Sequence, residues 1–239
     1  MDDSPATIDE MKMRSQIFQA LIEVLKPLEF TLALWQAGSA AHRRVDQWSD
    51  LDVILVVRDE FVPPTFTVVE QTLATLAPIS FQYRVPEPTW HGHAQCFYQL
   101  EGLSPYWIVD LAVMQLSNPR RFLEVERHGD PVVGFDKANL VVPKHINQDT
   151  HNQAIVSRLQ WLDTTFMFWQ SFVKKDVERK FLIDAVSAYH TWTLPPLIEL
   201  LNMRYRPYRY DFKTKYFSRE LPEYPSPKVN SKPASCVCT

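Results

Sequence analysis

The chain of 239 residues carries 25 Lys and Arg against 28 Asp and Glu, a formal net charge of −3, and 46% of its residues are hydrophobic. This composition is that of a folded globular protein and excludes a disordered chain, a collagen-like rod and a coiled coil. Because the chain has no net positive charge, nucleic acid is not the expected partner, whereas a small nucleotide needs only a local basic site.

Two features bear on where the protein works. The first residues, MDDSPATIDEMKMRSQ, are acidic and polar where a secretory signal would be basic and then apolar, and no apolar run approaches the ~20 residues of a membrane span. The three cysteines, Cys96, Cys236 and Cys238, form neither a disulfide framework nor a metal-ligand pattern. We therefore expect a cytoplasmic protein without a membrane partner.

The first half of the chain alternates helical and strand-like segments. Apolar residues recur at helical spacing from about residue 8 to 25, which predicts an amphipathic helix that ends near Pro27. The run FTLALWQAG (30–38) predicts a strand, and AAHRRVDQW predicts a short helix or turn. The run LDVILVV (51–57) predicts a buried strand.

A second helix and three more strands are expected before residue 143. The segment VVEQTLATLA, after the break at Pro63 and Pro64, has helical spacing. Prolines and glycines then separate three strand-like runs, ISFQYRV, AQCFYQL and YWIVDLAVM. Such alternation indicates a domain that combines helices with a sheet, and Cys96 is expected in its core.

The pattern becomes helical after Pro143. From about Asn152 to Met203, aromatic and aliphatic residues recur every three or four positions. The predicted fold class is therefore α+β, with a mixed-sheet domain over residues 1–145, an all-helical domain over 146–221 and a loose Pro- and Ser-rich tail over 222–239. The basic and aromatic segment 204–221 is expected to form a packed terminal helix and loop.

Two carboxylates stand at the front of a buried strand. Alternate side chains of a strand project from the same face, so Asp50 and Asp52 are expected to lie together while Leu51 and Val53 enter the core. Two close carboxylates repel unless a cation lies between them, and hard oxygen ligands favour Mg²⁺. Solvated acids at an exposed strand end are the alternative.

Two further features favour a metal and phosphate site. Gly38 and Ser39 end the preceding strand, where a glycine allows close backbone approach and a serine hydroxyl can hold a phosphate oxygen. Asp110 lies inside the apolar run YWIVDLAVM, where a carboxylate is costly to bury without a partner. A neighbouring strand that carried Asp110 beside Asp50 and Asp52 would complete a two-metal site.

Together these residues resemble a known family. Gly38-Ser39, a ten-residue spacer, Asp50-Leu51-Asp52 before an apolar strand, and a later strand Asp are similar to the nucleotidyltransferase superfamily with the DNA polymerase β palm-like fold. The phrase HGDPVVGFDK (128–137) resembles a segment that follows the third carboxylate in antibiotic nucleotidyltransferases. With a helical domain behind it, the layout is most similar to the aminoglycoside and lincosamide nucleotidyltransferases.

The resemblance implies a reaction and roles for these residues. Asp50 and Asp52 would hold Mg²⁺ on a triphosphate, Asp110 would ligate a second Mg²⁺ and help to deprotonate the acceptor, and Gly38 and Ser39 would hold the β and γ phosphates. The expected reaction transfers AMP from ATP to a hydroxyl of a small molecule such as an aminoglycoside or lincosamide, with release of pyrophosphate.

Several interpretations stay open. Arg43 or Arg44, in the insert after Ser39, and Lys175, in the helical half, are candidates to contact the triphosphate, and a solvated position is the alternative for each. His91 and His93 flank a glycine without the further ligands of a zinc site, which favours loop residues. The alternatives to a small-molecule acceptor are an antitoxin-like nucleotidyltransferase that modifies a protein partner and a catalytically degenerate nucleotide-binding member. The oligomeric state stays open between a monomer and a homodimer.

Overall fold

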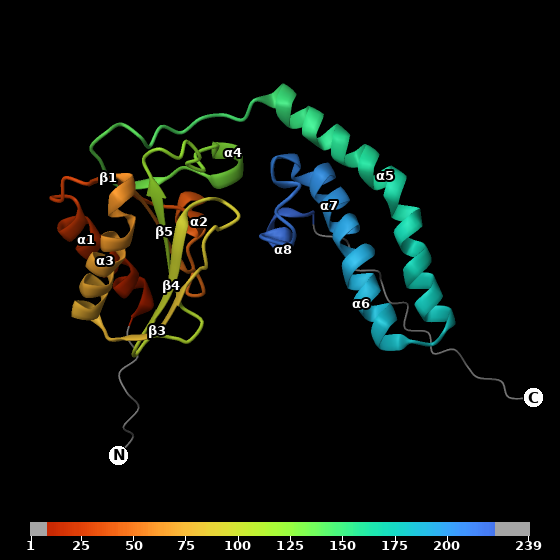
Figure 1. Cartoon of the computed structure of the whole chain (residues 1–239), viewed down its shortest axis with the longest axis horizontal. Coiled ribbons are helices and arrows are strands. Elements are labelled where there is room, and N and C mark those ends of the chain that lie inside the picture. Colours follow the sequence, from red (N-terminus) through yellow and green to blue (C-terminus); the bar gives the residue numbers. More distant parts are fainter. Residues whose placement is uncertain (1–8, 223–239) are drawn as a thin grey trace, which may run out of the picture. The chain divides into compact units, whose positions relative to one another are not determined.

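The computed structural model describes residues 9–222 and divides the chain into two compact units, with the boundary along the chain between Ile146 and Asn147. The first unit combines helices with a sheet, and the second is helical (Figure 1). The predicted α+β class, with a mixed sheet followed by a helical region, is confirmed. The tail predicted from residue 222, with Cys236 and Cys238, lies outside the described residues except for residue 222 itself.

The first unit has six strands and four α-helices within its described residues, plus one short 3₁₀ turn at Asp59–Phe61. In chain order they are α1 (Glu10–Leu25), β1 (Thr31–Gln36), α2 (Gly38–Ala41), β2 (Leu51–Val57), α3 (Val62–Leu76), β3 (Ile79–Arg84), β4 (Ala94–Leu100), β5 (Val109–Gln115), α4 (Val125–His128) and β6 (Val132–Asp136).

The strands form one mixed sheet in the order β3-β4-β5-β2-β1-β6. Only the central pair within this sheet, β2 and β5, is parallel, and the other described neighbours run antiparallel. A parallel pair needs a crossover connection, which here consists of α3, β3 and β4. Both central strands are rich in Val, Ile and Leu because each is flanked by strands on both sides and covered on one face by helices.

The two faces of the sheet differ. Helices α1 and α3 pack side by side against one face, where alternate residues of β2, β4 and β5 join the main core, including Leu51, Val53 and Cys96 (Figure 1). Burial confirms the prediction that Cys96 is a core residue, and it raises the pKa of the thiol. The opposite face carries a smaller apolar cluster that includes Trp35, Ile54 and Met114. Asp52 and Asp110 belong to this second face, so they are separated from the main core.

Local structure departs from the predicted elements at three places. Pro63 and Pro64 do not break the chain before the second helix but lie in its first turn, where a backbone N–H has no helical acceptor and proline costs little. Strand β5 begins at Val109, after an exposed Tyr106. In segment 204–221, where a terminal helix and loop were expected, the helical parts after α7 are the short turns Pro207–Arg209 and Phe217–Glu220, with left-handed backbone at Lys213 and Tyr216 between them.

The second unit consists of α5 (Gln148–Glu178), α6 (Leu182–Trp192) and α7 (Leu194–Tyr205), followed by those short turns. A stack of Trp169 on Trp192, with ring centroids 4.0 Å apart, and a two-pronged ion pair between Arg158 and Glu199 hold its helices together. No helix between residues 9 and 222 is both long and apolar enough to cross a membrane.

Candidate active site

Asp52 and Asp110 lie side by side at one end of the sheet. They are register partners on the parallel strands β2 and β5, so their side chains project from the same face, and neighbouring strands are about 4.8 Å apart. Both residues are half-buried. Like charges directly opposite one another destabilise a sheet, so this pair is the kind of feature that a bound cation stabilises.

Gly38 lies directly against the Asp52 carboxylate. It opens the short helix α2 with a φ of +54°, and a Cβ atom at this position would lie 1.8 Å from Asp52 Oδ2 and 2.4 Å from Asp52 Cγ. The Ala37 N–H also donates to the Asp52 carbonyl at 3.0 Å. The turn after β1 is therefore folded directly against the carboxylate, and only glycine fits there.

Ser39 is the next residue of the same turn, and 9% of it is exposed. Its Oγ is buried and has no hydrogen-bond partner among the residues that the structure describes. A buried hydroxyl without a partner costs about 1–3 kcal/mol, so it requires an explanation. A ligand oxygen at this turn would supply one.

Arg14 is the residue of the site that the sequence predictions missed. It lies on α1, 5% exposed, and its Nη1 donates to the carbonyls of Ser49, at 3.3 Å, and Asp50, while its Nη2 donates to Gln36 Oε1 at 3.2 Å. Burial lowers the pKa of Arg14, and the charges of Asp52 and Asp50 oppose that shift. Arg14 thus brings positive charge to the carboxylates and fixes the start of β2. Its spacing from Phe18, Leu21 and Leu25 places a cation on the apolar helix face, which was the available signal.

The remaining predicted residues differ in their placement. Asp50 immediately precedes β2 and is held through its carbonyl by Arg14. The backbone N–H of Arg44 donates to the Ser39 carbonyl at 2.9 Å, which folds the insert back onto α2, while Arg43 is exposed with a φ of +53°. Lys175 is exposed on α5 of the second unit, with its ammonium 5.2 Å from the Phe172 ring centroid. Its contact with a nucleotide stays a prediction.

The segment HGDPVVGFDK packs against this turn. Gly129 has a φ of +77°, and a Cβ there would lie 2.5 Å from the Ala41 carbonyl oxygen. The Asp130 N–H donates to that same oxygen at 2.9 Å. The chain then continues as β6, which pairs with β1. This segment therefore packs against the last residue of α2, Ala41, at the opposite end of the helix from Gly38.

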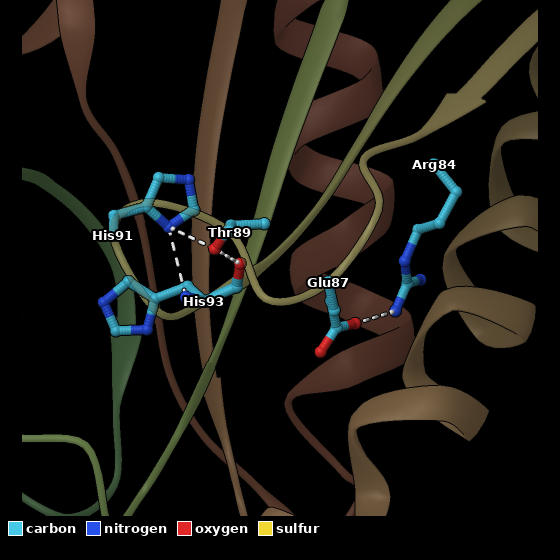
Figure 2. A network of polar contacts seen from close by, with 5 residues as sticks. All are labelled: Arg84, Glu87, Thr89, His91 and His93. Carbon is cyan, nitrogen blue, oxygen red and sulfur yellow. Dashed lines mark hydrogen bonds and ion pairs between the residues drawn. The ribbon is translucent and has the colours of Figure 1, made fainter.

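His91 and His93 lie in a loop, as predicted, and both are buried there. They lie before β4 but are 8% and 2% exposed, in a hydrogen-bonded loop with Thr89 (Figure 2). Burial lowers the pKa of His93 to about 4, and repulsion between the two imidazoles, when both are protonated, acts in the same direction. The Phe122 ring packs edge-on against both imidazoles, so the predicted loop is covered by an aromatic side chain.

A bound Mg²⁺ fits part of this arrangement. Within the described part of the chain no three His, Cys, Asp or Glu side chains converge as a ready metal site, so Asp50, Asp52 and Asp110 stay a predicted ligand set. Asp52 and Asp110 nevertheless supply paired hard oxygen donors, and Mg²⁺ in nucleotide sites is often held by one or two carboxylates with phosphate and water oxygens. Searches against protein-family models and against curated proteins returned no match for the chain.

Proposed function

We propose that the first unit is a Mg²⁺-dependent nucleotidyltransferase, which transfers AMP from ATP to a hydroxyl of a small molecule, an aminoglycoside or lincosamide being the expected class. The observation that carries the proposal is the meeting of Gly38 with the carboxylate of Asp52, beside its register partner Asp110. The unpartnered hydroxyl of Ser39 in the same turn supports it, because a phosphate oxygen would accept its hydrogen bond.

Each residue would have a separate task. Asp52 and Asp110, with Asp50, would hold Mg²⁺, which neutralises charge on the phosphates when bound. Gly38 lets the turn pack against the Asp52 carboxylate, and the Ser39 hydroxyl would donate to a phosphate oxygen. Arg14 holds the Asp50 backbone and so orients the start of β2. The acceptor oxygen would attack the α-phosphorus in line while pyrophosphate leaves, a reaction that depends on positioning and charge neutralisation.

Transfer of label from ATP labelled in its α-phosphate tests the proposal. The wild type is incubated with Mg²⁺ and a panel of aminoglycosides and lincosamides, and labelled product and pyrophosphate are measured together. Asp52→Asn should abolish both, whereas Glu101→Gln, which removes an exposed carboxylate from the β4–β5 turn, should leave both unchanged. Equal product from Asp52→Asn would show that the carboxylate pair has no part in transfer.

A protein acceptor is the second candidate. Considered by itself, the helical unit buries few apolar side chains: Leu162 and Ala185 are its buried hydrophobic residues within 147–222. Phe168, Leu182 and Ile183 are 59%, 70% and 86% exposed. Apolar surface of this kind is typical of protein interaction sites. Labelled AMP on a protein, with no labelled antibiotic, would favour this candidate.

A further inference from the structure

Hydrogen bonds link the side chains of His91, Gln95 and Asp110 in that order. Gln95, on β4, donates from Nε2 to Asp110 Oδ1 at 2.7 Å. The other end of the Gln95 amide, Oε1, lies 3.1 Å from His91 Nε2. Strands β4 and β5 pair antiparallel with Phe97 opposite Asp110, so Gln95 lies on the same face of the sheet as the carboxylate.

The backbone N–H of His93 sets the tautomer of His91 and, through it, the direction of the hydrogen bonds to Gln95 and Asp110. The backbone N–H of His93 donates to His91 Nδ1 at 3.1 Å, so Nδ1 carries a lone pair and the neutral ring carries its proton on Nε2 (Figure 2). His91 Nε2 therefore donates to Gln95 Oε1. A carboxylate only accepts, so the Gln95 NH₂ must face Asp110. A flipped amide would place oxygen against oxygen at Asp110 and donor against donor at His91.

The loop behind His91 is itself held firmly. The Thr89 hydroxyl donates to the His93 carbonyl at 2.6 Å, which closes the turn around the His91 ring (Figure 2). The Phe122 ring packs edge-on against His91 and His93, with centroids 6.2 Å and 5.6 Å away. Because both imidazoles are buried, the His91 ring has little freedom to turn. The fixed His91 ring therefore orients the Gln95 amide, and the Gln95 amide orients the Asp110 carboxylate.

We propose that Gln95 and His91 are positioning residues, which hold the Asp110 carboxylate in the orientation that binds Mg²⁺. The proposal rests on the proposed function, since it assigns a purpose to the orientation of a predicted ligand. An amide suits this task because it is neutral, so it orients the carboxylate without competing with the metal as a cationic side chain would. His91 contacts Gln95 and supplies the anchor from the opposite end.

The test measures how much Mg²⁺ is needed for ATP to raise the thermal midpoint of the full chain. Gln95→Leu should raise the half-saturating Mg²⁺ concentration about 10–100-fold, the usual effect of removing a residue that orients a metal ligand. Gln99→Leu is the matched control, because Gln99 lies on the same strand and face but donates to the Pro105 carbonyl. His91→Phe should act in the same direction as Gln95→Leu, and His91→Gln, which restores a donor, should act less.

The outcomes separate the two proposals. If the wild type shows no Mg²⁺-dependent rise with ATP, the proposed function fails and the positioning role fails with it. If the wild type responds and Gln95→Leu and His91→Phe need the same Mg²⁺ concentration as Gln99→Leu, only the positioning role is overturned. Should Gln95→Leu fail to fold, His91→Phe decides the matter, because it removes the anchor without touching Asp110.

Discussion

Replacing Gly38 with alanine tests how the turn after β1 packs against the Asp52 carboxylate. The φ of +54° costs a non-glycine residue about 1–2 kcal/mol. The added Cβ would also lie 1.8 Å from Asp52 Oδ2, so the carboxylate must move, and overpacking of this kind costs about 1–3 kcal/mol. The free energy of unfolding should therefore fall by about 2–5 kcal/mol, and the displaced carboxylate should abolish the Mg²⁺-dependent response to ATP.

Gly102→Ala is the matched control for Gly38→Ala. Gly102 has a φ of +79° in an exposed turn between β4 and β5, so alanine there meets comparable backbone strain away from the carboxylates. Denaturant unfolding followed by circular dichroism gives both free energies, and thermal midpoints with ATP and Mg²⁺ give the binding response. If Gly38→Ala were no less stable than Gly102→Ala and kept its response to ATP, the close approach of Gly38 to Asp52 would be refuted.

Three further changes test other parts of the account. Ser39→Ala should leave the stability of the ligand-free protein unchanged or raise it, because the Ser39 hydroxyl has no partner among the described residues. The same change should weaken ATP binding by about 0.5–1.5 kcal/mol, which calorimetric titration measures. Arg14→Leu should lower the free energy of unfolding by about 3–5 kcal/mol. In a double-mutant cycle, part of that loss should be absent when Asp52→Asn is also present, and strictly additive losses would show that Arg14 and Asp52 are not coupled. The pKa of His93 is lowered to about 4 from an ordinary value near 6.5, so between these pH values the unfolded chain binds more protons than the folded chain. The free energy of unfolding should therefore fall by up to about 3 kcal/mol as the pH falls from 6.5 to 4. A wild-type curve of stability against pH that runs parallel to that of His93→Gln over this range would contradict the prediction.

The sheet was predictable where a run of residues carried its own signal. Strands β2 and β4 coincide with the runs LDVILVV and AQCFYQL. The first is marked by β-branched side chains, and the second by alternating polar and apolar residues with two aromatic rings. Gly38 was expected to allow the close approach of a phosphate, which stays a prediction, and the contact that the structure shows there is with the Asp52 carboxylate. The pairing of β2 with β5 was only a hypothesis at the sequence level, since register between strands separated by a crossover has no local signature.

Residues that act through distant contacts were not predictable. Arg14 reaches Asp50 across 36 positions, and helical spacing identifies the buried face of α1 without identifying what that face meets. Gln95 reaches Asp110 only because β4 pairs antiparallel with β5, and the sequence shows it as one polar residue in an alternating strand. The prolines of α3 carried a local signal that had two meanings, because proline is common both after the end of a helix and in its first turn.

The thermal midpoint of wild type and Asp52→Asn with ATP, with and without Mg²⁺, tests the central claim most directly. At about 100 times its dissociation constant a ligand contributes about 2.7 kcal/mol to stability, which in a chain of this size raises the midpoint by about 5–11 °C. We expect that rise in the wild type only when Mg²⁺ is present, and no rise in Asp52→Asn. An equal rise in both proteins, or none in the wild type with any of the four nucleoside triphosphates, would contradict it.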